Sequence, residues 1–288
     1  MRLAPVLAMM LTVLAVPAFA TEDVIRFPSA EGTVVGTLSL PMGAPAPVVL
    51  LFHGFTGTRD ELAVAGTEEG VFSRTARLLR EAGYASLRID FRGSGDSSGE
   101  FADTTFEGQI ADGMQAVSVM SADPRVMGDT LAIIGWSQGG LVAAAVAGRS
   151  GVPDALALWA AVAKPQETFA GILGADVLTR GLASGEAGVS ITLPWGAQLD
   201  LRQGFFDGIA TLDPVAEIAA YKGPLFVAHG RQDTTVLPAA ADAFIAAHDG
   251  KETLMLADMD HVFNVFAGPE TLDQLVAATI AFFDAQVR

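Results

Sequence analysis

The chain of 288 residues contains no cysteine. This absence excludes disulfide bonds, thiol nucleophiles, thiolate zinc sites and a lipid-modified cysteine anchor. It also means that cysteine usage says nothing about the redox compartment. If the chain performs covalent catalysis, its nucleophile has to come from another residue type.

Basic residues are scarce. Lys and Arg number 17 against 33 Asp and Glu, which gives a formal net charge of −16 at pH 7. Binding to DNA or RNA depends on clustered Lys and Arg that neutralise phosphates, and the sequence has no such cluster. We therefore expect no nucleic-acid partner, whereas the acidity itself indicates only a well-solvated surface.

Long apolar runs are absent after the first twenty residues. Residues 1–20 place Arg2 before an apolar run, 3–16, and end in the small-residue sequence Ala-Phe-Ala at 18–20. This pattern predicts a cleaved signal peptide, with export of residues 21–288 to the periplasm or the medium and no stable membrane association afterwards. The alternative, an uncleaved anchor helix, is less favoured because the run is short of about 20 residues and contains Pro5.

Strand-like and helix-like segments alternate along the rest of the chain, which is 51% hydrophobic overall. The predicted strands are 24–27, 33–40, 47–53, 84–89, 131–136, 155–159, 224–229 and 252–256. The predicted helices are 71–82, 106–121, 138–148, 238–247 and 271–285. This order predicts a single α/β domain over 21–288 with a mostly parallel central sheet flanked by helices.

The alternation breaks between residues 164 and 212. Glycine-rich segments and a possible hairpin at 189–193 and 197–203 occupy this interval. We interpret the interval as a small cap inserted into the main domain.

The strongest local chemical signal is Gly-Trp-Ser-Gln-Gly-Gly at residues 135–140. Alone, a GxSxG match is weak, because glycine is abundant in this chain. Here the match lies between a predicted buried strand and a small-residue helix, as a nucleophile elbow requires. Ser137 is therefore the candidate nucleophile, with the helix N-terminus behind it directed at developing negative charge.

A serine hydroxyl needs a base, and the chain offers four histidines. His53 and His229 each end a predicted strand before a glycine, which suits a hydrogen-bonded turn residue at least as well as a catalytic one. His248 has the position of a helix C-terminus. His261 follows the last strand and precedes the last helix, where the chain order Ser, Asp, His would place the base.

Asp233 is the candidate acid, because it lies in the loop directly after the strand at 224–229. Asp258 and Asp260 are rivals by proximity to His261, but neighbours along a chain seldom face each other, so loop or capping roles are favoured for them. An acid at this position would fix the tautomer of the imidazole and stabilise its protonated form.

An oxyanion formed at Ser137 needs two N–H donors. We assign these to the backbone N–H groups of Phe55, in the loop after an early strand, and Gln138, directly after the nucleophile. Gly93 and Gly95 imitate a dinucleotide fingerprint but lack its third glycine, so we expect no organic cofactor there. No metal site is expected either.

Several stretches together resemble the α/β-hydrolase superfamily of serine hydrolases. They are HGFTG at 53–57, DFRGSGDS at 90–97, GWSQGG at 135–140, PLFVAHGRQDTTVLP at 224–238 and DMDH at 258–261. More narrowly, the chain resembles the cinnamoyl or feruloyl esterase-like branch and its serine aminopeptidase-like relatives. Trp136 departs from this branch, which often has histidine there, and we expect it to affect the shape of the pocket at most.

Aromatic residues in the insertion are candidates for substrate binding, namely Trp195, Phe205 and Phe206. The plain alternative is that these side chains, with Phe169, form the small core of the cap, and the sequence favours neither interpretation.

The expected function is that of an exported serine carboxylesterase that hydrolyses small to medium esters through an acyl-enzyme, with hydroxycinnamoyl esters among the candidates by resemblance. The partner expected is a small-molecule ester. Two alternatives stay open: a serine aminopeptidase or amidase of the same fold, and a catalytically inactive binding relative. The oligomeric state cannot be predicted.

Overall fold

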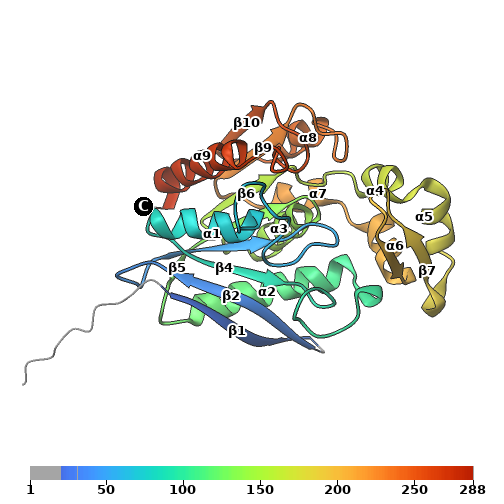
Figure 1. The fold of residues 1–288 in the computed structure, drawn as a ribbon, viewed down its shortest axis with the longest axis horizontal. Helices are drawn as coiled ribbons and strands as arrows, with labels where there is room; N and C mark the ends of the chain where they lie inside the picture. The colour runs from blue at the N-terminus through green and yellow to red at the C-terminus, as the bar shows by residue number, and fades with distance from the viewer. Residues whose placement is uncertain (1–20, 31, 288) are drawn as a thin grey trace, which may run out of the picture.

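The computed structural model describes residues 21–30 and 32–287, and its main feature is an eight-stranded sheet (Figure 1). In spatial order the strands are β1 (Thr21–Ser29), β2 (Gly32–Leu40), β4 (Ala85–Asp90), β3 (Pro47–Phe52), β5 (Met127–Trp136), β6 (Ala155–Trp159), β9 (Leu225–Gly230) and β10 (Glu252–Ala257). β2 is antiparallel to β1 and β4, and the remaining pairs are parallel. The predicted fold class, a mostly parallel sheet flanked by helices, is confirmed.

Helices cover both faces of the sheet. The helices on one face are α1 (Val71–Glu81) and α9 (Glu270–Val287), and those on the other are α2 (Phe106–Ala122), α3 (Gln138–Ser150), α7 (Pro214–Ala220) and α8 (Ala239–Ala247). Two separate apolar clusters result, one on each side of the sheet.

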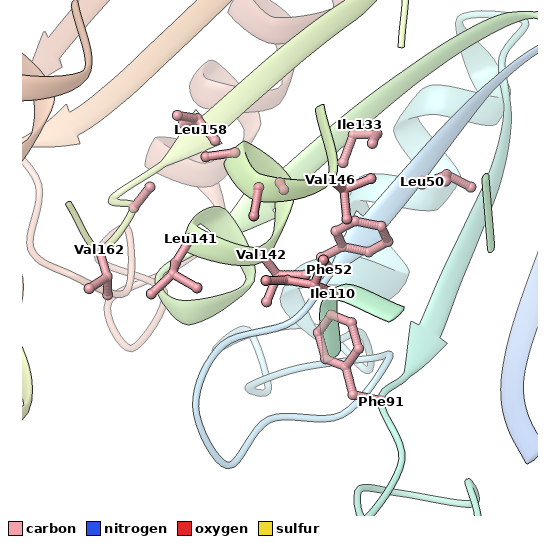
Figure 2. Close-up of a cluster of buried hydrophobic side chains, with 14 of the residues drawn as sticks. Leu50, Phe52, Phe91, Ile110, Ile133, Leu141, Val142, Val146, Leu158 and Val162 are labelled. Atoms are coloured by element: carbon pink, nitrogen blue, oxygen red, sulfur yellow. The ribbon is translucent and has the colours of Figure 1, made fainter. Parts of the chain in front are cut away.

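Strand β3 shows why its sequence is a continuous apolar run. Leu50 and Phe52 point into the cluster under α2 and α3, whereas Val49 and Leu51 point into the cluster under α1 and α9. Figure 2 shows Phe52 beside Val142 and Val146 of α3. Because successive side chains of a strand face opposite sides, only a strand that is buried on both faces can be apolar throughout.

Helix α3 follows β5 and is buried along its whole first part, residues 138–147. Its small residues allow close packing against β3, β5 and β6. The helix thus begins at the carboxyl edge of the sheet, where the loops that follow β3, β6 and β9 also start.

The interval 164–212 forms a group of short elements at one end of the molecule, on the right in Figure 1. They are α4 (Pro165–Leu173), α5 (Ala175–Gly181), the short 3-10 helix at Gly185–Ala187, the antiparallel hairpin β7 (Val189–Thr192) and β8 (Gln198–Leu201), and α6 (Gln203–Thr211). The predicted hairpin is present. The helices were not predicted, because each has nine residues or fewer and contains glycine, which weakens a helical pattern.

Residues 1–20, on which the signal-peptide prediction falls, lie outside the described part of the chain. Within residues 21–30 and 32–287, no helix is both long and apolar enough to cross a membrane.

Candidate active site

Ser137 occupies a strained turn between β5 and α3. Its φ of 56° and ψ of −118° are unfavourable for a residue with a Cβ atom. The turn is held by hydrogen bonds from the Ser137 N–H to the Trp159 carbonyl, 3.0 Å, and from the Val162 N–H to the Ser137 carbonyl, 3.1 Å. A Cβ on Gly139 would lie 2.0 Å from the Phe52 carbonyl oxygen, so α3 can approach β3 this closely only with glycine there.

Three side chains from separate loops form one hydrogen-bonded chain at this turn. His261 Nε2 lies 3.0 Å from Ser137 Oγ, and His261 Nδ1 lies 2.8 Å from Asp233 Oδ2. Asp233 is fully buried, whereas the His261 side chain is 15% exposed and Ser137 is 7% exposed. The three residues that the sequence predicts as nucleophile, base and acid are thus brought together in the order that proton transfer requires.

Asp233 is held as a carboxylate by several donors. Its Oδ1 accepts the N–H groups of Thr235 at 2.8 Å and Val236 at 2.9 Å. Burial alone would raise the pKa of Asp233, but hydrogen bonds from His229, His261 and the Val236 N–H, with the charge of His261, hold that pKa well below its usual range.

His229 is a fourth polar group that contacts Asp233, and the sequence suits it to a hydrogen-bonded turn role at least as well as to a catalytic one. Its Nε2 lies 2.9 Å from the Val236 carbonyl oxygen and 3.3 Å from Asp233 Oδ2. A carbonyl can only accept, so the proton is on Nε2, and the same N–H is within reach of the carboxylate. The sequence signal that could have identified it is the spacing of four residues between His229 and Asp233 across the end of β9.

Trp136 corrects a prediction. The sequence predicts an effect of Trp136 on pocket shape at most, but its indole Nε1 donates to the His261 carbonyl oxygen at 3.1 Å. The two rings are 6.0 Å apart, and Trp136 is 3% exposed. Trp136 therefore contacts the loop that carries the predicted base.

The other acids and histidines that the sequence offered as candidates have structural partners. Asp260 Oδ1 accepts the N–H groups of Val262 and Asn264, which is the capping role that the sequence favours. Asp258 lies 3.4 Å from the Arg231 guanidinium. His248 ends α8 and bonds Glu252.

The two predicted oxyanion donors are available. Within the described part of the chain, the N–H groups of Phe55 and Gln138 donate to no protein atom. The Gln138 side chain is turned away into the protein, where its Nε2 donates to Gln109 Oε1 at 2.7 Å. Both N–H groups can therefore serve a bound oxygen.

The peptide that joins Gly54 to Phe55 is fixed through its carbonyl. The Gly54 oxygen accepts from His53 Nδ1 at 2.8 Å and from the Gly57 N–H at 3.1 Å. His53 Nε2 accepts the Phe91 N–H at 3.1 Å, which places the ring proton on Nδ1. Burial lowers the pKa of His53 to about 4, so the ring is neutral at pH 7. Because the carbonyl is bonded, the N–H of the same peptide becomes a stronger donor.

The predicted substrate-binding aromatics have two different environments. Phe205 and Phe206 are buried, at 0% and 1% exposure, whereas Trp195 in the β7–β8 turn is 57% exposed. Phe205 stacks on the Phe55 ring at 5.5 Å, and Phe169 of α4 contacts the same ring edge-on at 5.4 Å. Phe205 and Phe206 therefore form the core of the insertion and support the loop of Phe55, and direct substrate contact by any of the three stays a prediction.

No group of three or more His, Asp or Glu side chains suited to a metal ion occurs within residues 21–30 and 32–287. The strained serine turn, the Ser137–His261–Asp233 chain and the parallel sheet define the class of α/β-hydrolase-type serine hydrolases. The profile of the prolyl oligopeptidase family matches residues 71–288, and the chain belongs to this family.

Among characterised relatives, dipeptidyl aminopeptidase BIII of Pseudoxanthomonas mexicana is 26% identical over 278 residues, which are 87% of this chain and 36% of that protein. The chain spans well under half the length of the curated relatives that it matches, 36% and 39%.

Solved structures with a similar fold include two esterases. Est1E from Butyrivibrio proteoclasticus, solved with ferulic acid, has a TM-score of 0.70 and 21% identity and covers 91% of this chain and 99% of its own. The Pyrococcus furiosus esterase Pf2001 has a TM-score of 0.69 and 18% identity, with coverage of 93% and 94%. At these identities the likeness concerns the fold alone.

Proposed function

We propose that the protein is a serine carboxylesterase that hydrolyses small to medium carboxylic esters through an acyl-enzyme intermediate. The observation that carries the proposal is the unbroken chain from Ser137 Oγ to His261 at 3.0 Å and from His261 to Asp233 at 2.8 Å. The N–H groups of Phe55 and Gln138, which have no protein acceptor within the described residues, support it as well.

The reaction follows from this geometry. His261 Nε2 takes the proton of Ser137 as the hydroxyl attacks the ester carbonyl carbon, and the N–H groups of Phe55 and Gln138 receive the oxyanion. The protonated His261 then gives its proton to the departing alcohol. Water, activated by His261, attacks the acyl-Ser137 ester and releases the acid by the same route in reverse. No metal or organic cofactor takes part.

A cavity of about 440 Å³ beside the oxyanion loop is the candidate site for part of the ester. It is lined by Thr56 and Gly57 of that loop, by Phe101 and by residues 197–200 of the hairpin. Its size suits a small or medium substituent. By likeness of fold to Est1E, hydroxycinnamoyl esters are among the candidate substrates.

A peptidase or amidase is the second candidate, favoured by the family and by the dipeptidyl aminopeptidase relative. The acids of the insertion do not form a site that could bind a substrate amine. The Asp176 side chain is 80% exposed and pairs with Arg180 of its own helix, and Glu186 is also exposed.

Comparison of four substrates separates these candidates. The purified protein would be assayed with p-nitrophenyl acetate, p-nitrophenyl octanoate, methyl ferulate and an aminoacyl anilide, with Ser137→Ala as the control. We expect ester turnover that the substitution abolishes. The relative rates with the three esters show which acyl group the pocket prefers. Turnover of the anilide alone would move the protein to the peptidases. Inertness toward all four and toward a fluorophosphonate probe would favour a binding protein.

We further propose export with cleavage after Ala20. Expression in a bacterial host with fractionation should yield a periplasmic or extracellular product whose N-terminal residue is Thr21. A cytoplasmic product that retains residues 1–20 would contradict this proposal.

A further inference from the structure

Glu61 places a carboxyl group beneath the oxyanion loop. The Gly54 N–H donates to Glu61 Oε1 at 2.6 Å. A Cβ on Gly57 would lie 2.4 Å from that oxygen and 2.7 Å from the carboxyl carbon, so the carboxyl group packs directly against the turn at 54–57. Glu61 itself has a φ of 62°, a conformation that a side-chain residue keeps only when its surroundings fix it.

Gly54 is therefore held at both of its peptide groups. Its N–H is bonded by Glu61, and its carbonyl, which belongs to the peptide that carries the Phe55 N–H, is bonded by His53 and Gly57. An ideal Cβ on Gly54 would lie 3.4 Å from Ser137 Cβ and 3.5 Å from Glu61 Oε1. Ser137 Cβ and Glu61 Oε1 are therefore both close to Gly54 and lie no more than about 7 Å apart.

We propose that Glu61 is a positioning residue for the oxyanion hole, which acts as a neutral carboxylic acid that holds the loop of Phe55 in place. This inference rests on the proposed acyl-transfer reaction. The neutral acid accepts the Gly54 N–H through its carbonyl oxygen, whereas an ionised carboxylate so close to Ser137 would oppose the negative charge of the oxyanion.

The surroundings favour the neutral form. Burial raises the pKa of Glu61 to about 8, although backbone N–H groups of Gly54 and Leu62 oppose the shift. The charged neighbours on its own loop have other partners: Arg59 binds Asp90 and Asp96, and Asp60 binds Arg88. His53, which bonds the Gly54 carbonyl, is neutral at pH 7. From the turn after β5, Ser137 approaches Gly54, with its Cβ 3.4 Å from the ideal Cβ position of that glycine.

The test is the pH profile of kcat/KM for p-nitrophenyl butyrate between pH 6 and 9.5, with the uncatalysed rate subtracted. For the wild type we expect a decline with a midpoint near pH 8. Glu61→Gln keeps an oxygen acceptor of similar shape without the charge. It should retain neutral activity within about threefold and lose the alkaline decline.

Two further variants separate positioning from charge. Glu61→Leu removes the acceptor, and Gly57→Ala displaces the carboxyl group while leaving every charge in place. Each should lower kcat by about 10-fold to 100-fold with little change in KM, less than the loss of a whole oxyanion donor. Thermal melting curves would establish that the variants are folded. The matched control is Asp60→Asn, an exposed neighbour that should keep the wild-type alkaline decline.

An alkaline decline that persists in Glu61→Gln, or wild-type kcat in both Glu61→Leu and Gly57→Ala, would overturn the assignment. The rate of fluorophosphonate labelling of Ser137 gives the same pH profile without an ester substrate. Failure of both ester turnover and labelling in the wild type would reject the acyl-transfer proposal, and this inference with it. Normal turnover with an unaltered profile in Glu61→Gln would reject the role of Glu61 alone.

Discussion

The two sides of Ser137 are built by opposite electrostatic means. On the proton-transfer side, a buried carboxylate, Asp233, is stabilised by donors that hold its pKa low. On the oxyanion side, the groups that fix Gly54 are His53, with a pKa of about 4, which bonds its carbonyl, and Glu61, with a pKa of about 8, which bonds its N–H, so both are neutral at pH 7. A negative charge, that of Asp233, thus lies beside the imidazolium that forms on His261, whereas the groups that hold the oxyanion loop carry no charge.

The largest expected effect comes from the charged side. Asp233→Asn keeps the shape of the side chain but removes the negative charge and the acceptor that fixes the tautomer of His261. We expect kcat to fall by about 10⁴-fold. Steady-state kinetics with p-nitrophenyl acetate would measure this, and retention of more than a tenth of wild-type kcat would contradict the role of Asp233 as the acid.

The turn that joins the two sides should tolerate almost no added volume. In Gly139→Ala the new methyl group would meet the backbone of β3, with the Phe52 oxygen 2.0 Å away, so we expect a loss of about 3 kcal/mol of unfolding free energy. Urea denaturation at pH 7 would measure it. The matched control is Gly171→Ala in α4, where no atom lies within 4 Å and helix propensity should raise stability by about 0.5–1 kcal/mol. Equal effects of the two variants would show that the turn is not tightly packed.

On the oxyanion side, the neutral His53 predicts that the protein loses stability in acid. The folded pKa of His53, about 4, lies below the ordinary value of 6.5, so the unfolded chain binds more protons between these values. The contribution of His53 to the free energy of unfolding is therefore fully present above pH 6.5 and is lost as the pH falls toward 4. At pH 4.5 the loss amounts to about 2 kcal/mol.

Urea midpoints at pH 7 and pH 4.5 would test this for wild type and His53→Gln. The variant should lose about 2 kcal/mol less than the wild type between the two pH values. An identical loss in both proteins would mean that His53 is not held neutral.

The smallest of these effects concerns the support of the carboxylate. His229→Leu removes the donor 3.3 Å from Asp233 Oδ2, and we expect kcat to fall by about 10-fold. The acidic limb of the kcat/KM profile should also move to higher pH, because a carboxylate with one hydrogen bond fewer attracts the imidazolium more strongly. His229→Gln, which keeps a donor, should recover part of both effects. A lower melting temperature with an unchanged profile would reduce His229 to a packing role.

Sequence alone predicted much of this account, for identifiable reasons. β3 and the second half of β5, residues 131–136, are continuous apolar runs, and a run buried on both faces occurs mainly in parallel sheets. Ser137 was identifiable because the strained turn requires glycine two residues before and two residues after it, at 135 and 139. His261 and Asp233 were identifiable because the chain order of this fold places them after particular strands.

Contacts between distant residues were not predictable in the same way. Trp136 bonds the carbonyl of His261, which is 125 residues away, and no local pattern signals such a pair. Glu61 follows the oxyanion loop as one more polar residue in a polar stretch, and only its packing against Gly57 distinguishes it. The insertion was the least predictable region because its helices are short and its aromatic side chains suit either a core or a pocket.

Peptide mapping of protein that is quenched in acid during turnover of p-nitrophenyl acetate tests the central claim most directly. The account predicts an acetyl group on the peptide that contains Ser137, and no such adduct and no p-nitrophenol release above background with Ser137→Ala. An acetyl group on another residue, or wild-type turnover by Ser137→Ala, would contradict it.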